Sequence, residues 1–401
     1  MTMPVKPAAS VSMLDSLQAA PVAEQQRRGY TDTLREILQQ PATWRDTAAR
    51  LADAGARSML KSLLAAQPAH IVLTGSGSSV YVGECVAPVL QAALGIPCMA
   101  IPAGTLLTSR RGVLPSGRGL LVSIARSGDS PESTGVVDQV LAAEPGYAHL
   151  AVTCNANGKL ATRYRDEPRM HVLQLDERTN DRSLVMTSSF TNLLLGCSGL
   201  RHGASSEGDA RLADAAAAVA GQVFARYGDA LANAAATDVP AAVYLGSGAA
   251  LGAAREAALK MLEMSGGAVR VLPETFLGLR HGPMSWLDEQ CLVVAFLSGE
   301  PGVRGYEYDL LRELNRKGLG GTRVVVGESI PADVVGPNGI AIELPGLYAL
   351  EEAQQQMVHV VVGQLLAFFR CLALDQRPDA PSQGVLTRVV ESFAIHAEGG
   401  A

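Results

Sequence analysis

The sequence predicts an α/β protein with two doubly wound parallel sheets, one after the other along the chain. Short apolar runs alternate with longer amphipathic stretches, which is the pattern of parallel strands joined by covering helices. The chain has 401 residues, about enough for two cores of this kind. Its 48% hydrophobic and 18% charged residues suit strands that are buried on both faces.

An internal repeat supports two domains of the same kind. Residues 71–79 read Ile-Val-Leu-Thr-Gly-Ser-Gly-Ser-Ser, and residues 242–250 read Ala-Val-Tyr-Leu-Gly-Ser-Gly-Ala-Ala. Residues 120–129 are echoed by residues 291–300 at the same offset of 171 positions. A third apolar run, Leu150 to Cys154, has its counterpart near Arg323 to Gly327. A repeat of this length indicates a duplicated domain and not a solenoid.

The domain boundaries follow from the repeat. We expect an N-terminal lead-in and helix over residues 1–45, a first domain over 46–215 and a second over 216–401. The boundary should lie in the alanine-rich helical stretch 208–236. Residues 1–28 lack the apolar core of a signal peptide, so we expect a polar, partly disordered lead-in and a cytoplasmic protein.

Composition argues against several classes of function. A net charge of −6 without a dense Lys/Arg block predicts no nucleic-acid or membrane partner. The six cysteines are far apart, so we expect neither a metal site nor disulfides. The apolar run Met357 to Leu374 contains His359, Gln364 and Arg370, which favours a helix buried within or between subunits over a membrane span.

The two Gly-Ser-Gly loops follow predicted strands, where a doubly wound sheet binds its ligands. A dinucleotide fingerprint would need a third glycine, but Val80 and Leu251 stand at those positions, so NAD is disfavoured and no cofactor is expected. The first copy instead carries hydroxyls and one guanidinium: Ser76, Ser78 and Ser79 on one loop, and Arg126, Ser127, Ser130 and Ser133 on the other.

These hydroxyls, together with free helix N–H groups, predict a phosphate site, although such loops also serve as plain tight turns. Ser130 before Pro131 is a plausible N-cap and first helical residue. The second copy has Ala249, Ala250 and Leu297 at the matching positions, which predicts one phosphate site per chain.

The second copy carries a different pattern. Glu256, Lys260 and Glu263 fall at i, i+4 and i+7 on one helix face, either as a solvated ion-pair ladder or as part of a site. His281 follows on a Gly-Pro turn, where a histidine is structural or faces a cleft.

These residues resemble a known family. Residues 256–263 (Glu-Ala-Ala-Leu-Lys-Met-Leu-Glu) followed by 279–283 (Leu-Arg-His-Gly-Pro) are similar to the isomerase half of glucosamine-6-phosphate synthase, and more closely resemble the AgaS-type sugar isomerase (SIS) proteins. Further matches lie at residues 35–41 (Arg-Glu-Ile-Leu-Gln-Gln-Pro), 126–133, 181–191 (Asp-Arg-Ser-Leu-Val-Met-Thr-Ser-Ser-Phe-Thr) and 388–390. The resemblance implies two tandem SIS domains, each a flavodoxin-like α/β/α sandwich.

The resemblance also implies residue roles. Glu263 matches the base that moves a proton between C1 and C2, and His281 the residue that assists ring opening. The implied substrate-binding residues are Ser78, Ser79, Arg126, Ser127, Ser130, Lys260 and Arg388. Arg388 stands where the synthase has a lysine, and because arginine stays protonated we expect it to bind and not to react. Two departures, Asp129 and Leu277, place a carboxylate beside the phosphate loop and a large side chain where a smaller one is expected.

The implied activity is that of an aldose-ketose isomerase or deaminase acting on a hexose 6-phosphate. The leading expectation is the conversion of galactosamine 6-phosphate to tagatose 6-phosphate and ammonia. The alternatives are an isomerase of neutral ketose and aldose phosphates, a glucosamine-6-phosphate deaminase and a non-catalytic sugar-phosphate sensor. We expect a homodimer or a higher homo-oligomer in which His281 reaches a neighbouring subunit's site.

Overall fold

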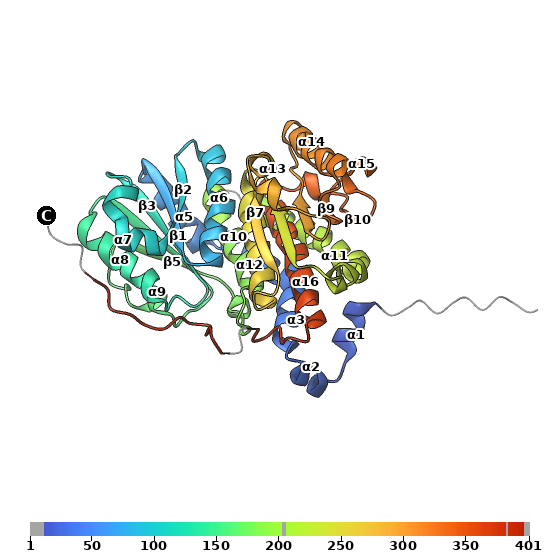
Figure 1. Cartoon of the computed structure of the whole chain (residues 1–401). Helices are drawn as coiled ribbons and strands as arrows, with labels where there is room; N and C mark the ends of the chain where they lie inside the picture. Colours follow the sequence, from blue (N-terminus) through green and yellow to red (C-terminus); the bar gives the residue numbers. More distant parts are fainter. Residues whose placement is uncertain (1–11, 203–205, 382–383, 397–401) are drawn as a thin grey trace, which may run out of the picture.

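The computed structural model describes residues 12–202, 206–381 and 384–396, and contains two five-stranded sheets (Figure 1). The first sheet consists of β1 (His70–Gly75), β2 (Cys98–Pro102), β3 (Gly119–Ala125), β4 (Tyr147–Thr153) and β5 (Met170–Gln174). The second consists of β6 (Ala241–Leu245), β7 (Arg270–Glu274), β8 (Leu292–Phe296), β9 (Thr322–Gly327) and β10 (Gly339–Glu343). The predicted α/β class with tandem doubly wound sheets is confirmed.

The two sheets share one topology. The strand orders are β2-β1-β3-β4-β5 and β7-β6-β8-β9-β10, and every pairing is parallel. This 2-1-3-4-5 order is the flavodoxin-like arrangement. The direction of winding changes between β1 and β3 in the first sheet, and a ligand crevice is expected beyond the carboxyl ends of those strands.

Helices cover both faces of each sheet. The N-terminal helices are α1 (Met13–Ala19), α2 (Val22–Arg28), α3 (Thr31–Leu38), α4 (Gln40–Ala52) and α5 (Ala54–Ala65). The first domain adds α6 (Ser78–Leu94), α7 (Ala103–Val113), α8 (Pro131–Ala143), α9 (Lys159–Thr162), η1 (Glu177–Thr179), α10 (Ser188–Ser198) and η2 (Gly199–His202). The second part has α11 (Ser206–Ala236), α12 (Ala249–Met264), α13 (Phe276–Leu279), η3 (Pro283–Trp286), α14 (Pro301–Lys317), α15 (Ala332–Val335), η4 (Leu347–Ala349) and α16 (Glu352–Ala373). The predicted boundary at residues 215 and 216 falls inside α11.

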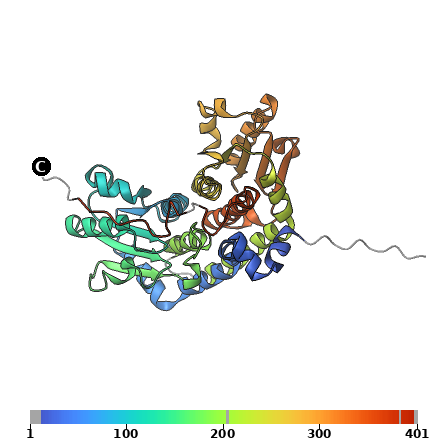
Figure 2. The ribbon, with the colours of Figure 1, turned by 60° about the horizontal axis from the view of Figure 1, so that its bottom comes forward.

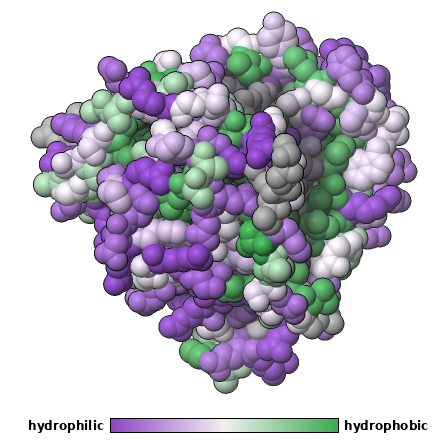
Figure 3. All heavy atoms as spheres, turned by 90° about the vertical axis from the view of Figure 1, so that its left-hand side faces the viewer, coloured by the Kyte–Doolittle hydropathy of each residue, from purple (hydrophilic) through white to green (hydrophobic). Residues whose placement is uncertain are grey.

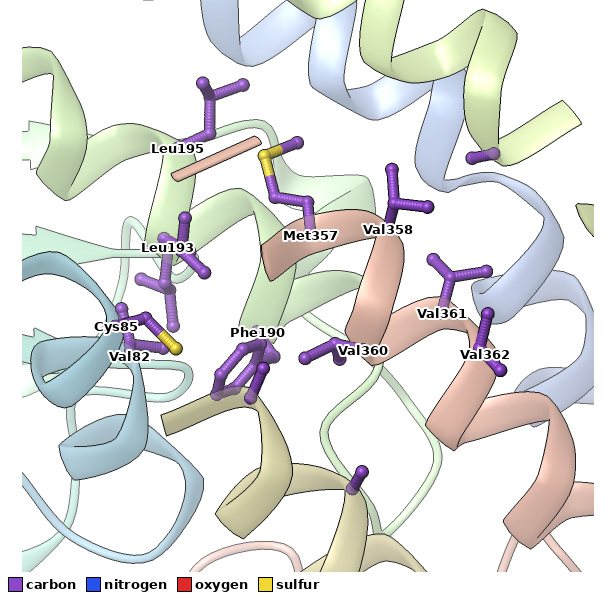
Figure 4. Packing of buried hydrophobic residues seen from close by; sticks show 14 of the residues in the cluster. Val82, Cys85, Phe190, Leu193, Leu195, Met357, Val358, Val360, Val361 and Val362 are labelled. Atoms are coloured by element: carbon purple, nitrogen blue, oxygen red, sulfur yellow. The ribbon is translucent and has the colours of Figure 1, made fainter. Parts of the chain in front are cut away.

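The main core lies between the two sheets. Ile71 and Leu73 of β1 belong to this core, whereas Val72 between them belongs to a smaller cluster with α7 and α8 on the outer face. Such alternation is expected because successive strand side chains point to opposite faces. Side chains from α6, α10 and α16 meet in the main core (Figure 4).

Helix α16 lies at the centre of the molecule (Figure 2). By length and composition it could cross a membrane, but 89% of its most apolar window is buried against the rest of the chain. It packs against α12, α11, α10, α3 and α6. The chain therefore covers this helix by itself, which is the first of the two expected alternatives, burial within a subunit or between subunits.

The described part of the N-terminal segment is mostly helical. Residues 1–11 lie outside the described residues, but residues 13–28 form helices α1 and α2 and not a disordered stretch. The Ser12 hydroxyl caps α1 by accepting the Asp15 N–H at 3.1 Å. Leu14 and Leu17 are buried, and their apolar area ties the segment to the core.

Residues 384–396, named here the C-terminal strap, leave the second domain and run along the first (dark red in Figure 1). The strap carries six exposed large apolar side chains: Val385, Leu386, Val389, Val390, Phe393 and Ile395. The face of the molecule on the first domain's side is otherwise largely hydrophilic, with smaller apolar areas (Figure 3).

Candidate active site

A cavity of about 230 Å³ lies beyond the carboxyl ends of β1 and β3. It is lined by both loops of the first domain, one face of α12, the 184–186 segment and the strap. The predicted site residues that line it are Ser78, Ser79, Arg126, Ser127, Ser130, Lys260, Glu263 and Arg388. The predicted His281 does not line it.

The first loop ends on the N-terminus of α6. Gly77 precedes this helix with φ of 56°, a left-handed value that favours glycine. A Cβ on Gly75 would lie 2.5 Å from the Ser79 Cβ, so the strand end and the helix start are in close contact. Ser76, Gly77, Ser78 and Ser79 line the cavity, so the N-terminus of α6 lies at its wall, and the positive end of a helix dipole suits an anion.

The second loop ends on α8. Ser130 is its N-cap residue and Pro131 its first residue, as predicted. The Ser130 and Ser133 hydroxyls lie 2.8 Å apart. With Ser127 they add hydroxyl groups to a second helix N-terminus on the same cavity.

Helix α12 supplies a buried ion cluster. Lys260 Nζ lies 2.5 Å from Glu263 Oε2, 3.4 Å from Glu256 Oε1 and 3.1 Å from Ser78 Oγ. The side chains of Glu256 and Lys260 are 0% and 1% exposed, and that of Glu263 is 25% exposed. The three groups are therefore not a solvated ladder: Lys260 and Glu263 line the cavity, and Glu256 lies behind them.

Burial and charge shift the acid–base properties of this cluster. Burial raises the pKa of Glu256 to about 7, against the opposing attraction of Lys260. Burial would lower the pKa of Lys260, but Glu256 and Glu263 together raise it above its ordinary value. Lys260 therefore carries a positive charge next to both carboxylates.

Close packing between α12 and α6 brings this cluster to the first domain. A Cβ on Gly252 would lie 2.7 Å from Cys85 Sγ and 2.8 Å from the Cys85 backbone nitrogen. The absence of a side chain at Gly252 lets the two helices approach. Lys260 can then donate to Ser78 across the domain interface.

Both predicted arginines line the cavity but are held by backbone carbonyls. Arg126 is buried and donates to the carbonyl oxygens of Ser183 at 3.1 Å and Leu184 at 2.9 Å. It also donates to the carbonyl of Arg388 in the strap at 3.0 Å. Arg388 in turn donates to carbonyl oxygens of Asn180 and Asp181. Burial lowers the pKa of Arg126 from its ordinary value.

The two departures from the family pattern lie outside the cavity lining. Asp129 was expected to place a carboxylate beside the phosphate. Its Oδ1 instead accepts the backbone N–H of Lys159 at 3.0 Å, at the start of α9, because free N–H groups at a helix start attract a carboxylate. Leu277 is exposed on α13, and His281 is exposed at its end.

Several lining residues were not predicted. Leu184, Met186 and the strap residue Val389 lie inside recognised motifs, and Leu386 lies shortly before one, but an apolar side chain gives no sequence signal for a site. Glu132 lies inside the recognised 126–133 motif and also lines the cavity. Its buried Oε2 has no hydrogen-bond partner among the described residues. Within those residues there is also no group of three or more His, Cys, Asp or Glu side chains that could hold a metal ion.

Comparison with known proteins identifies relatives of this chain. A Streptomyces coelicolor protein provisionally named D-galactosamine-6-phosphate deaminase AgaS is 38% identical over 91% of this chain and 95% of its own length. The Escherichia coli D-galactosamine-6-phosphate deaminase AgaS is 33% identical over 91% and 96%. The crystal structure of tagatose-6-phosphate ketose/aldose isomerase from Escherichia coli superposes with a TM-score of 0.81 at 30% identity, covering 94% of this chain and 99% of that one. No protein-family model matches the chain.

Two parallel SIS-type sheets, with a serine-lined cavity beyond the carboxyl ends of β1 and β3, define an enzyme of the sugar-phosphate isomerase and deaminase class. Within that class, the chain belongs to the AgaS family. This agrees with the resemblance of its motifs and sets aside a non-catalytic sensor.

Proposed function

We propose that the chain converts galactosamine 6-phosphate and water to tagatose 6-phosphate and ammonia. The names of its Escherichia coli and Shewanella relatives, D-galactosamine-6-phosphate deaminase AgaS, support this substrate. The observation that carries the proposal is the Glu263 carboxylate on the cavity wall, held by the buried Lys260 ammonium.

Glu263 acts as the general base in this proposal. In the ring-opened sugar, the C1 carbonyl makes the C2 proton acidic, and Glu263 removes it to give an enolamine. Return of a proton to C1 gives a ketimine, and water then hydrolyses the C2–N bond, releasing ammonia and leaving the ketose phosphate. One positioned carboxylate is sufficient for both proton transfers.

The serine loops bind the other end of the substrate. Ser79, Ser127 and Ser130 line the cavity beside two helix N-termini, a combination that suits a phosphate dianion. Arg126 and Arg388 add positive charge on the same cavity. Binding of the phosphate fixes C2 relative to Glu263, which lowers the entropic part of the barrier.

A second candidate is the interconversion of neutral ketose and aldose 6-phosphates. A crystal structure from Clostridium novyi NT, provisionally named tagatose-6-phosphate ketose/aldose isomerase, has a TM-score of 0.89 at 32% identity. The same base would move the same proton, and no nitrogen would be released.

Ammonia release from galactosamine 6-phosphate, measured beside glucosamine 6-phosphate, tests the proposal. We expect turnover of the galacto compound with the higher kcat/KM. Turnover of tagatose 6-phosphate to an aldose phosphate, without ammonia from either amino sugar, would contradict deamination and support the second candidate.

The assembly is also a proposal. His281 is exposed and absent from its own cavity lining, which fits a histidine that completes the site of a neighbouring subunit. We therefore infer a homodimer or higher homo-oligomer. A cytoplasmic location stays a prediction, supported by six cysteines that are all free.

A further inference from the structure

Two recognised motifs, residues 35–41 and 181–191, contain no proposed acid, base or phosphate ligand, yet they are in contact. Glu36 of α3 is 1% exposed. Its Oε1 accepts the Arg182 N–H at 2.6 Å, and its Oε2 accepts the Ser183 N–H at 3.3 Å and the Ser183 hydroxyl. One buried carboxylate therefore fixes the backbone of residues 182 and 183.

The other side of this backbone faces the cavity arginines. The carbonyls of Ser183 and Leu184 accept from Arg126, and those of Asn180 and Asp181 accept from Arg388. The segment from Asn180 to Leu184, named here the carbonyl loop, thus holds both guanidinium groups. Arg126 and Arg388 also join the carbonyl loop to the strap that covers the cavity.

The remainder of the 181–191 motif anchors the loop at its far end. The Asp181 carboxylate accepts the backbone N–H groups of Thr187 and Ser189, each at 2.8 Å. Gln39 of the first motif donates to the Ser188 hydroxyl at 2.9 Å. Of these anchoring residues, Glu36 is the one that binds the backbone N–H of Ser183, whose carbonyl accepts from Arg126.

We propose that Glu36 is a positioning residue for the sugar-phosphate site: it holds the carbonyl loop so that Arg126 and Arg388 stay in the cavity wall and the strap stays over the cavity. Glu36 itself does not line that cavity. Its kinetic consequence rests on the proposed function, because it concerns the binding of a phosphorylated sugar.

A purely structural role is the competing explanation, and the chain offers a matched control. Glu307 of α14 is also fully buried, and it accepts a backbone N–H, from Ser298 at 2.9 Å. It lies in the second domain and does not line the cavity. Loss of either carboxylate should lower stability, but only loss of Glu36 should change substrate binding.

The kinetic experiment compares Glu36→Ala, Glu36→Gln and Glu307→Ala with galactosamine 6-phosphate. We expect Glu36→Ala to raise KM about tenfold with kcat within about threefold, because the Glu263 base is on a separate helix. Glu36→Gln keeps one acceptor oxygen and should rescue most of this loss. Glu307→Ala should keep KM within about twofold. An unchanged KM in Glu36→Ala, with a loss of stability like that of Glu307→Ala, would overturn the proposal.

A second measurement needs no substrate. Amide hydrogen exchange of residues 385–390 should become faster in Glu36→Ala and stay unchanged in Glu307→Ala. If Glu36→Ala does not fold, Ser183→Ala removes one of the contacts to Glu36 and should shift exchange and KM in the same direction. Unchanged exchange in the folded Glu36 and Ser183 variants would refute the positioning role. If Glu36→Ala shows faster exchange but the wild-type protein releases no ammonia, the proposed function is contradicted and the positioning role of Glu36 is still supported.

Discussion

Lys260 Nζ of the second domain lies 3.1 Å from Ser78 Oγ of the first, and the same ammonium contacts Glu256 and Glu263 on its own helix. The base of the proposed reaction and the first turn of the phosphate-loop helix are therefore joined by one buried cation. In the proposed reaction, substrate binding at one end of the cavity and proton transfer at the other would depend on the same packing of α12 against α6.

Removal of this cation should strongly destabilise the fold. Lys260→Met leaves Glu256 buried without its counter-charge, and we expect a loss of about 3–5 kcal/mol in the free energy of unfolding, measured in urea. The double variant Lys260→Met, Glu256→Gln should recover part of that loss. A loss in the single variant below about 1 kcal/mol would show that Glu256 is already neutral.

Stability should fall as the pH rises through neutrality. Burial raises the pKa of Glu256 from 4.5 to about 7, and burial with the nearby Asp181 does the same for Glu36. Because the folded state holds these protons more tightly, their contribution is fully present below about pH 4.5 and is lost above about pH 7. The expected decrease is about 3 kcal/mol per group.

Urea unfolding between pH 5 and pH 8 measures this dependence. Lys260 keeps its charge across this range and adds no slope. Glu256→Gln should flatten the profile, with the slope due to Glu36 remaining. A profile for Glu256→Gln as steep as that of the wild type would place the raised pKa on another group.

Arg126→Ala should weaken the binding of 6-phosphorylated sugars by about 1.5–3 kcal/mol, measured by calorimetry. The loss includes the contact between Arg126 and the strap carbonyl of Arg388. Asp129→Asn is the matched control and should change affinity less than about twofold, since that carboxylate caps α9. Wild-type affinity in Arg126→Ala would mean that the phosphate binds elsewhere.

Mixed subunits test the role of His281. Glu263→Gln and His281→Ala proteins should each be inactive, and a mixed dimer should regain up to about half of the wild-type activity, because one site then has both residues intact. Subunit exchange should first be verified with a tagged wild type. Exchange without recovered activity would place His281 outside the neighbouring site.

Much of the fold could be predicted from local patterns. Buried strands such as β4 and β9 contain short apolar runs, Leu150–Val152 and Val324–Val326, and the offset of 171 positions predicted the second sheet. Helices α1 and α2 were not predicted as separate elements because each has seven residues, too few to show a clear helical period. Burial of helix α16 was predicted from its apolar side chains. These side chains do not indicate whether the covering helices belong to the same chain or to another subunit.

The site was predictable where polar residues belong to a recognised sequence motif. Arg126 and Ser130 beside the second loop and Glu263 on α12 line one cavity as expected. The contact of Asp129 with the start of α9 could not be predicted, since only the three-dimensional structure brings that helix beside it. The contact of Glu36 with Ser183 links residues 147 positions apart, and no local pattern reports such a pairing.

The identity of the proton-transferring base is the central claim, and deuterium uptake tests it most directly. Wild-type enzyme and Glu263→Gln are incubated with galactosamine 6-phosphate in deuterated water, and the sugar phosphates are analysed by mass spectrometry. The amide keeps the shape of the side chain but cannot accept the C2 proton, so we expect sugar-phosphate affinity within about threefold of wild type and no deuterium uptake. Deuterium uptake by Glu263→Gln at the wild-type rate would contradict the account.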